Sequence, residues 1–422
     1  MLVVSPSDFS ICLVGLVVGT FILLISNFPT LPALQKWIIA SFALALTLIG
    51  GCIHQQTVAE QAAYRSGYDL DRLRELYASG DQSQWPEPAL HPTVDQAAFE
   101  DIGPLSQVEY PGDNPFSPAK RELGKLLFFD PRLSQSKQIA CASCHNPELG
   151  WTDNLTRSFG HDRQTGKRNA MTIQNSAFAE TLFWDGRAES LEDQAGFPIG
   201  DPVEMNHSLP LAVEGIANIE GYRAHFEAAF GDEAVTEKRI RQAIATFERS
   251  IVSGRSRFDR FVQGNPEALD DQELLGLHLF RTQAGCINCH HTPYFSDNQF
   301  HNDGQTLWGS DHEDLGRYYI TGETADLGLF RTPTLREVAH TGPWMHHGHF
   351  PTLLDVVQFY NLGNPAPIQR KYRGTPRDSL IPEPSPLLHE LGLSDYEVDA
   401  VVAFLHTLST PKRRMRMPEM PQ

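Results

Sequence analysis

Two short stretches of the chain carry the same arrangement of cysteine and histidine. Each reads C-x-x-C-H: Cys141, Cys144 and His145 form the first, and Cys286, Cys289 and His290 form the second. Two thiols at this spacing can add to both vinyl groups of a haem and form thioethers. The histidine then lies beneath the iron and ligates it through one imidazole nitrogen. The motifs therefore predict two covalently attached haem c groups.

A zinc site and a redox-active dithiol are the alternatives to haem. Zinc needs two further ligands, usually within about 12–20 residues, and no other cysteine lies near either motif. The motifs begin at residues 141 and 286, too far apart for one small zinc module. A redox dithiol does not require a histidine after its second cysteine, and both motifs have one. The residues favour haem over both alternatives.

The chain has 422 residues and a formal net charge of −18. This acidity argues against nucleic acid as a partner, because phosphates are bound by lysine and arginine. It is compatible with docking of a basic protein partner, and equally with simple solubility.

The N-terminus contains two apolar runs. Phe9–Phe28 is long enough to cross a bilayer. Trp37–Ile49 is shorter, follows Lys36 and ends just before Cys52, which resembles a bacterial lipoprotein signal peptide. The alternative is a hairpin of two membrane helices. Both interpretations anchor the chain on the periplasmic side of the inner or outer membrane, through a lipidated Cys52 or a transmembrane helix.

Hydrophobic periodicity and capping residues predict the helices. Ser117 followed by Pro118 is a typical helix start. Further helices are expected near Leu70–Tyr77, Leu211–Phe230, Glu237–Val252, Asp271–Arg281, Leu353–Tyr360 and Ser394–Leu408. In the last of these, Ser394 and Glu397 form a capping box. Few alternating strand patterns occur, and no repeat is evident beyond the two haem motifs.

The predicted fold is mainly α, with two cytochrome-c-like haem domains and long loops behind an N-terminal membrane or signal segment. The expected parts are a signal or anchor segment (1–52), a tether with a docking segment (53–113), an N-terminal haem domain (114–256), a C-terminal haem domain (257–412) and a tail (413–422).

The second axial position of each iron decides what such a protein does. An electron carrier fills this position permanently. A peroxidase must leave it open, or able to open, so that hydrogen peroxide reaches the iron. Peroxide reduction also requires proton transfer between the two oxygens, hence a carboxylate or similar base beside the open position.

Residues 114–410 resemble the bacterial dihaem cytochrome c peroxidases, a family that includes the MauG-like enzymes. The matching motifs are Cys-Ala-Ser-Cys-His-Asn from Cys141, Ser158-Phe-Gly-His161, Gly166-Lys-Arg-Asn169, Phe183-Trp-Asp-Gly-Arg187, Leu191-Glu-Asp-Gln194, Val203-Glu204-Met-Asn206, Phe330-Arg-Thr-Pro-Thr-Leu-Arg336, Thr341-Gly-Pro343 and Gln358-Phe-Tyr360. So many motifs in one order are specific for the family, though not for its substrate.

The resemblance implies a role for each matching residue at the first haem. His145 is the proximal ligand of the peroxidatic haem, and His161 the distal ligand that leaves on activation. Glu204 is the catalytic acid/base, and Gln194 a second distal-pocket residue. Trp184 lies between the haems as a stepping stone for electrons.

Each of these residues also has a plainer interpretation. A loop histidine such as His161 is commonly a surface residue, a lone glutamate a solvated charge, and a tryptophan such as Trp184 core packing. Val203 and Met205 beside Glu204 nevertheless indicate partial burial, which would raise the pKa of its carboxyl.

The resemblance also implies a calcium ion between the domains. Asn169, Thr341 and Pro343 match its ligands, and only Asn169 would bind through its side chain. Amide and backbone oxygens suit this hard cation.

At the second haem, His290 is the implied proximal ligand, and the distal position departs from the peroxidases. They carry a methionine where this chain has Tyr360, and MauG-like members carry a tyrosine. A thioether favours ferrous iron, whereas a phenolate favours ferric iron. Tyr360 could alternatively be a core aromatic of its helix. Rival ligands are nearby histidines: His346, His347 and His349. His301 has no predicted role.

The sequence thus predicts a membrane-anchored dihaem c-type peroxidase that reduces hydrogen peroxide with electrons from a small cytochrome or quinol. The alternatives are a MauG-like oxidase that uses peroxide to oxidise a protein or small organic substrate, and a non-catalytic dihaem electron carrier. Membership of the family also implies a possible homodimer.

Overall fold

The structure, a computed structural model, describes residues 67–363, 374–412 and 414–422. Helices and long loops dominate this part of the chain, and its strands are β1 (Phe300–His301) and β2 (Phe330–Arg331), which pair antiparallel. The predicted mainly α class is confirmed. The predicted signal or membrane segment and its Cys52 lie outside the described residues. Among the described residues, no helix has both the length and the apolar character needed to cross a bilayer.

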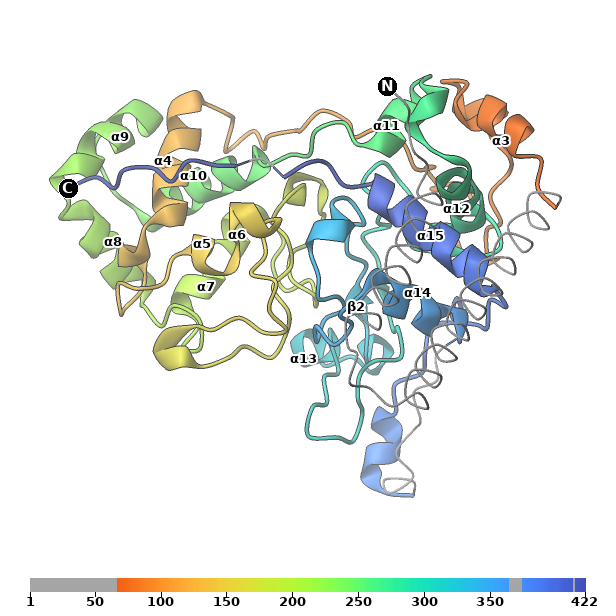
Figure 1. Cartoon of the computed structure of the whole chain (residues 1–422). Coiled ribbons are helices and arrows are strands. Elements are labelled where there is room, and N and C mark those ends of the chain that lie inside the picture. The colour runs from red at the N-terminus through yellow and green to blue at the C-terminus, as the bar shows by residue number, and fades with distance from the viewer. Residues whose placement is uncertain (1–66, 364–373, 413) are drawn as a thin grey trace, which may run out of the picture. The chain divides into compact units, whose positions relative to one another are not determined.

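The helices fall into two groups (Figure 1). Around the first haem motif lie α4 (Pro118–Phe129), α5 (Cys141–Cys144), α6 (Leu191–Gln194), α7 (Phe197–Gly200), α8 (Leu209–Ala217), α9 (Glu220–Phe230) and α10 (Glu237–Arg249). With the second motif lie α3 (Leu70–Tyr77), α11 (Arg257–Val262), α12 (Asp271–Arg281), α13 (Tyr318–Thr321), α14 (Leu353–Asn361) and α15 (Asp395–Thr407). We call these the first and second halves.

Short 3-10 turns connect the helices within the long loops. They are η1 (Gln82–Gln84), η2 (Pro131–Leu133), η3 (Pro147–Leu149), η4 (His161–Arg163), η5 (Ser176–Phe178), η6 (Pro266–Ala268), η7 (Cys286–Asn288), η8 (Thr324–Asp326), η9 (Val338–His340) and η11 (Pro376–Leu380).

Capping residues set the helix starts as predicted. The Ser117 side chain accepts a hydrogen bond from the Lys120 amide, with Pro118 at the first helical position of α4. The capping box of Ser394 and Glu397 opens α15. The predicted bounds of α3 and α12 are those observed.

Two predicted helices have the wrong bounds. Leu211–Phe230 is not one helix, because the chain leaves α8 at Asn218 and passes through an extended Ile219 before α9 begins. Asparagine competes with the helical backbone for hydrogen bonds, and Ile219 packs against the first core. The helix predicted for Glu237–Val252 ends at Arg249, after which the Ser253 amide donates to Asn175 Oδ1.

Each half is built on one close helix pair, α4 with α10 and α12 with α15. A methyl group on Gly124 would lie 1.8 Å from the carbonyl oxygen of Ala243, and one on Gly276 would lie 1.9 Å from that of Ala400. Around the second pair packs a fully buried aromatic cluster of Phe258, Phe280, Phe295 and Phe404.

The Gly276 crossing is tight enough to predict a large effect on stability. We expect Gly276→Ala to lower the free energy of unfolding by about 3 kcal/mol, since the obstructing atom is backbone and the two helices must separate. Denaturant unfolding measures this change. Gly215→Ala is the matched control, because Gly215 lies exposed in α8 with open space around it, and should stabilise by about 0.5 kcal/mol. Equal stability of both variants would contradict the predicted clash.

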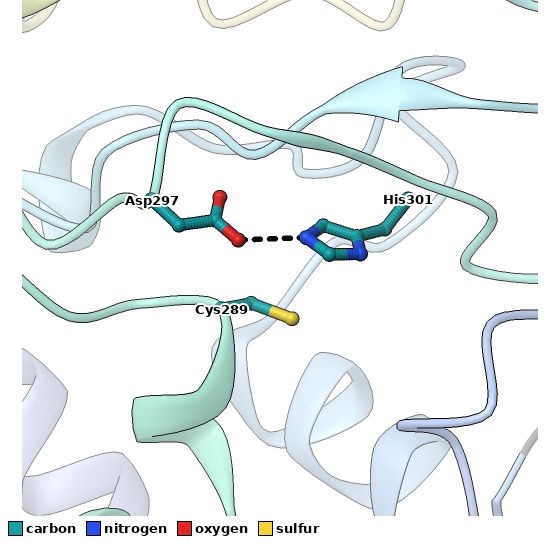
Figure 2. Close-up of side chains that lie close together, drawn as sticks. All are labelled: Cys289, Asp297 and His301. Carbon is teal, nitrogen blue, oxygen red and sulfur yellow. Dashed lines mark hydrogen bonds and ion pairs between the residues drawn. The ribbon is translucent and has the colours of Figure 1, made fainter. Parts of the chain in front are cut away.

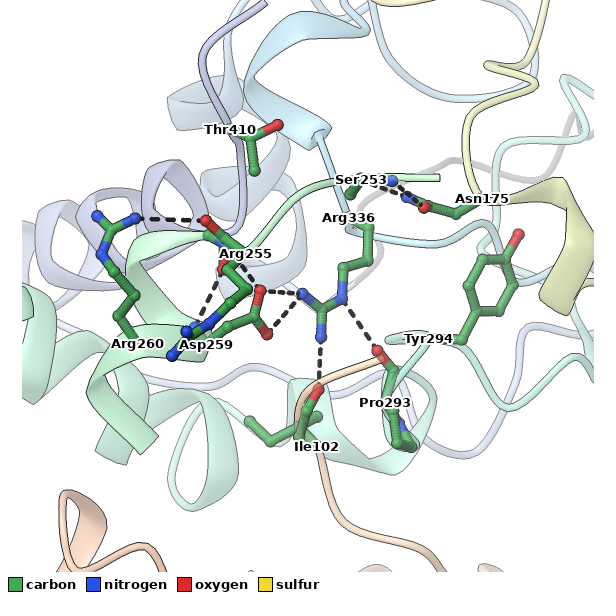
Figure 3. A network of polar contacts seen from close by, with 12 residues as sticks. Ile102, Asn175, Ser253, Arg255, Asp259, Arg260, Pro293, Tyr294, Arg336 and Thr410 are labelled. Carbon is green, nitrogen blue, oxygen red and sulfur yellow. Dashed lines mark hydrogen bonds and ion pairs between the residues drawn. The ribbon is translucent and has the colours of Figure 1, made fainter. Parts of the chain in front are cut away.

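The segment before the first half packs on the second half. Arg74 of α3 donates to the Leu269 carbonyl at 2.6 Å and to Asp271 at 2.9 Å. Arg336 of the second half is nearly fully buried and donates to Asp259 and to the Pro293 carbonyl (Figure 3). It also donates to the carbonyl of Gly103, which belongs to the segment before the first half. This segment was predicted as part of a tether, and these contacts bind its residues Arg74 and Gly103 to the second half.

The C-terminal residues return to the first half. Met415 and Met420 pack against its core, and the Gly221 amide of α9 donates to the Gln422 carbonyl at 2.8 Å. Figure 1 shows the C-terminal stretch of the chain passing from α15 toward α9. The end of the chain therefore links the two halves.

Candidate functional site

The first C-x-x-C-H motif forms a single helical turn, α5. The His145 amide closes the turn by donating to the Cys141 carbonyl at 3.0 Å. Its side-chain Nδ1 lies 3.1 Å from the Trp151 carbonyl, and burial lowers the pKa of this histidine. A neutral imidazole that donates from Nδ1 leaves Nε2 free to ligate a metal.

The second motif repeats this arrangement at η7. The His290 amide donates to the Cys286 carbonyl at 2.9 Å, and Nδ1 of His290 lies 3.0 Å from the Phe295 carbonyl. Burial lowers the pKa of His290 to about 4. Trp151 and Phe295 both adopt a left-handed backbone conformation, with φ of 62° and 58°. Both halves thus use the same turn to orient the proximal histidine.

The four motif cysteines have the character expected of haem attachment sites. All are free thiols. Burial raises the pKa of Cys141, that of Cys144 to about 11 and that of Cys286 to about 12. The motif geometry and the free Nε2 atoms fit two haem c groups.

The loop that carries His161 is fixed directly onto the loop that carries Glu204. The His161 amide donates to the carbonyls of Val203 at 3.0 Å and Glu204 at 2.8 Å. Gly160 permits this approach, because a methyl group there would lie 2.0 Å from the Val203 carbonyl oxygen. The His161 side chain is 15% exposed, and its Nδ1 is buried without a hydrogen-bond partner. The structure therefore brings these two predicted residues together.

Glu204 has the electrostatic character of an acid/base. Burial, reinforced by the charge of Asp201, raises the pKa of its carboxyl to about 6, against the opposing charge of Arg187. The Glu204 charge also acts on Cys141 and Cys144, whose pKa values it raises. The carboxyl therefore lies within electrostatic reach of the first haem attachment site. The sequence predicted the direction of this shift from Val203 and Met205.

Gln194 and Trp184 lie in the same connecting segment. Gln194 is the last residue of α6 and is half-buried. Trp184 is also half-buried, donates from Nε1 to the Asn169 carbonyl at 2.9 Å, and lies edge-on to His346 of the second half. Trp184 is thus at the contact between the halves, where a residue between the haems was predicted.

Tyr360 lies on the last turn of α14. Burial, together with the nearby Asp303 carboxylate, raises the pKa of its phenol well above the ordinary value. Burial likewise raises the pKa of Asp303 to about 6. A phenolate at Tyr360 would therefore need a strong cation such as ferric iron next to its oxygen.

The rival histidines have other neighbours. His346 stacks on Phe330 and makes an edge-on contact with Trp184. His347 stacks on His349, with ring centroids 4.0 Å apart. His349 is exposed.

His301, to which the sequence assigned no role, belongs to a cluster at the second motif (Figure 2). Its Nε2 lies 2.7 Å from Asp297 Oδ2, and the Asp297 amide donates to the Cys289 carbonyl at 2.8 Å. Although burial opposes it, the hydrogen bonds to Asp297 and Cys289 raise the pKa of His301 to about 10. Cys289, Asp297 and His301 could together hold a metal ion, but Cys289 becomes a thioether when haem is attached. The sequence spacing of Asp297 and His301 gave no signal for this contact.

The residues predicted to bind calcium lie around the contact between the halves. The buried Asn169 donates from Nδ2 to the Leu155 carbonyl at 2.8 Å, which turns Oδ1 the opposite way. Gly348 is adjacent to that amide, and with Pro343 it lines a hollow of about 710 Å³. The Thr341 hydroxyl donates to the Val338 carbonyl at 3.2 Å, so this side chain is occupied elsewhere.

Comparison with known proteins gives relatives over most of the chain. A family model described as di-haem cytochrome c peroxidase matches residues 118–267. The chain is 39% identical over 315 residues to the methylamine utilization protein MauG of Methylorubrum extorquens, covering 74% of this chain and 85% of that protein. It is 37% identical over 326 residues to the cytochrome c551 peroxidase of Nitrosomonas europaea, covering 77% and 89%.

Solved structures share the fold. A MauG-like protein associated with microbial copper homeostasis matches with a TM-score of 0.63 and 30% identity, covering 76% of this chain and 96% of that one. The diheme peroxidase BthA of Burkholderia thailandensis matches with a TM-score of 0.60 and 26% identity, covering 79% and 97%. With two attachment motifs for c-type haem and these relatives, the chain belongs to the di-haem cytochrome c peroxidase family.

Proposed function

We propose that the protein is a dihaem c-type peroxidase that reduces hydrogen peroxide to two molecules of water, using two electrons and two protons. The observation that carries this proposal is Glu204. Glu204 is half-buried, and burial raises the pKa of its carboxyl to about 6. Its carbonyl accepts a hydrogen bond from the amide of His161, the predicted distal histidine. A plain electron carrier has no use for an acid/base beside its haem.

The haems supply the iron at which the O–O bond breaks and a store for one of the two electrons. Glu204 accepts the proton from one peroxide oxygen and returns it to the other, which leaves as water. With a pKa of about 6, the carboxyl is ionised at neutral pH and can take this proton. The charge of Arg187 favours the ionised form of Glu204. The guanidinium carbon of Arg187 lies 3.6 Å from the centroid of the Phe183 ring.

His161 is the proposed gate. Its imidazole would ligate the first haem iron in the resting protein and would have to move away before peroxide could bind. Two hydrogen bonds hold the His161 backbone to the Glu204 loop, so any movement of this backbone would also shift the acid/base.

The gate can be tested by removing the imidazole. We expect His161→Ala to bind cyanide and react with peroxide in the fully oxidised state, whereas the unaltered protein requires prior one-electron reduction. Absorption spectra of the oxidised protein during cyanide titration measure the difference. Lys167→Ala, an exposed change in the same loop, should behave like the unaltered protein. Identical cyanide binding by the unaltered protein and both variants would show that His161 does not ligate the iron.

The proposed electron donor is a small cytochrome or a quinol, and electrons reach the first haem from the second through Trp184. A basic cytochrome would complement the −18 charge of the chain. We place the protein on the periplasmic side of the membrane, anchored through residues 1–52, with haem domains at 114–256 and 257–412. A homodimer is part of the same proposal.

A MauG-like oxidase is the second candidate, and Tyr360 is the observation that favours it. A phenolate ligand would keep the second haem at low potential and so hinder its reduction by a cytochrome. In that case peroxide would serve to oxidise a protein or small organic substrate.

We also propose one calcium ion between the halves, held by Asn169 Oδ1 with the carbonyl oxygens of Thr341 and Pro343. The support is the donor chemistry, because one amide oxygen and two backbone carbonyl oxygens suit a hard cation, together with the burial of Asn169, whose Nδ2 is already bound to the Leu155 carbonyl. The ion would hold Trp184 in place, because Trp184 donates to the Asn169 carbonyl.

Peroxide titration of the holoprotein, with and without a reduced small cytochrome, separates the candidates. Catalytic oxidation of the cytochrome supports the peroxidase. A stoichiometric reaction with peroxide, whose lasting change in the haem spectrum the reduced cytochrome barely reverses, supports the MauG-like oxidase. Failure to consume peroxide after prior one-electron reduction would leave only the electron carrier.

A further inference from the structure

Two segments in the contact between the halves follow the same backbone path. Each contains one antiparallel bridge, Leu182 with Ala188 in the first and Trp344 with Phe350 in the second. Residues with positive φ match in pairs at a constant separation along the chain: Asn175 with Glu337 (64° and 64°), Phe183 with Met345 (67° and 68°), and Gly186 with Gly348 (70° and 65°). Ser190 and Thr352, at the same separation, cap α6 and α14. The sequences of the segments differ too much to show this repeat.

The same match pairs Trp184 with His346 and Asn169 with Arg331. Under this pairing, each hydrogen bond between the segments has a counterpart that joins the equivalent residues in the opposite direction. The Asn169 amide donates to the His346 carbonyl at 2.7 Å, and the Arg331 amide donates to the Trp184 carbonyl at 2.8 Å. Reciprocal contacts of equivalent residues define an isologous, two-fold interface. The two halves therefore meet as two copies of one unit would, with Trp184 and His346 at equivalent positions.

The two equivalent rings touch. The Trp184 and His346 centroids are 6.3 Å apart with an interplanar angle of 69°, and His346 stacks on Phe330 at 3.8 Å and 13°. His346 is 2% exposed, and its Nδ1 is buried without a hydrogen-bond partner. Burial, followed by the charge of His347, lowers the pKa of His346 to about 3, so the ring is neutral. An unpaired buried ring nitrogen lowers stability, and an apolar side chain at this position would avoid that loss. Core packing alone does not account for a histidine here.

We infer that His346 is the second half's counterpart of Trp184, and that the two rings together form the contact through which one electron passes between the haems. The inference rests on the proposed function and adds a residue to it. In this step the second haem is oxidised by one electron and the first is reduced by one, and no bond or proton changes place. His346 acts by extending the aromatic contact of Trp184 and by holding that ring against it, so it is a positioning residue.

The test measures electron transfer between the haems without peroxide. In protein reduced by one electron in a flash experiment, the redistribution of the electron between the two haems is followed by absorption. We expect His346→Ala and His346→Leu to slow this rate by at least about tenfold relative to the unaltered protein, and His346→Phe to restore most of it, because a planar ring returns. If His346 had a purely structural role, the electron-transfer rate would vary with the stability of each variant, whether or not the variant carries a ring.

His349→Ala is the matched control, since His349 is exposed in the same loop and its own ring contact is with His347. Haem spectra and unfolding midpoints of all variants establish that both haems remain ligated. An unchanged rate in His346→Ala with intact haem spectra would overturn the inference, as would equal slowing in the leucine and phenylalanine variants. Because peroxide is absent, neither outcome depends on whether the protein is a peroxidase.

Discussion

Glu204→Gln is expected to reduce peroxide turnover by about 10²-fold or more. Glutamine keeps the shape and polarity of the side chain but cannot accept and return a proton. The backbone bonds from His161 run to carbonyl groups of the Glu204 loop and are independent of this side chain. Haem ligation should therefore survive the change, and the loss should appear in turnover with peroxide and a reduced cytochrome.

The same residue predicts the acid limb of the pH profile. Burial raises the pKa of Glu204 from an ordinary 4.5 to about 6. The ionised base thus decreases as the pH falls through 6, and turnover should fall with it. In Glu204→Gln the remaining turnover should lose this inflection.

The control is Glu189→Gln, an exposed change between Trp184 and Gln194, for which we expect unaltered turnover and pH profile. Near-normal turnover in Glu204→Gln would show that another group moves the proton. The proposed function would then lose the observation on which it depends.

Local signals along the sequence predicted the helices and the attachment sites well. Ser117 with Pro118, and Ser394 with Glu397, act through hydrogen bonds over three residues, so sequence alone contains them. The break at Asn218 was missed because Ile216 and Ile219 both belong to the apolar pattern of one long helix. Packing of Ile219 into the core decides against that helix.

The predicted site residues that the structure brings together lie in loops, and here sequence reasoning depended on family resemblance. No periodicity predicts that the His161 amide meets the Glu204 loop. That contact depends on the space at Gly160. The cluster of Asp297 and His301 and the proximity of Asp303 to Tyr360 also arise from long-range folding of irregular backbone.

The repeat between the halves shows the limit most clearly. Trp184 and His346 occupy equivalent positions, yet the matching segments share mainly backbone conformation. Left-handed residues such as Phe183 and Met345 are not glycines, so their φ values are imposed by the surrounding structure and leave no mark in the sequence. Only coordinates make the equivalence visible.

Tyr360→Met is expected to raise the reduction potential of the second haem by about 0.1 V or more, because a neutral thioether replaces an anionic oxygen that favours ferric iron. Burial raises the pKa of the phenol well above its ordinary value, so a phenolate at Tyr360 would form only as a ligand of the iron, and exchanging that ligand should act directly on the iron. Stepwise potentiometric titration with absorption detection measures the potential of each haem.

Tyr319→Met is the control, since Tyr319 is 53% exposed on α13 and should leave both potentials unchanged. Tyr360→Phe removes the donor atom and keeps the ring, so it should open the second axial position and allow cyanide to bind there. If the reduction potential of the second haem rises in Tyr360→Met, and this variant oxidises a reduced cytochrome faster with peroxide, then Tyr360 favours the MauG-like activity in the unaltered chain. If neither the reduction potential of the second haem nor its cyanide binding changes, Tyr360 is a core aromatic. The second haem then has no phenolate ligand to lower its potential.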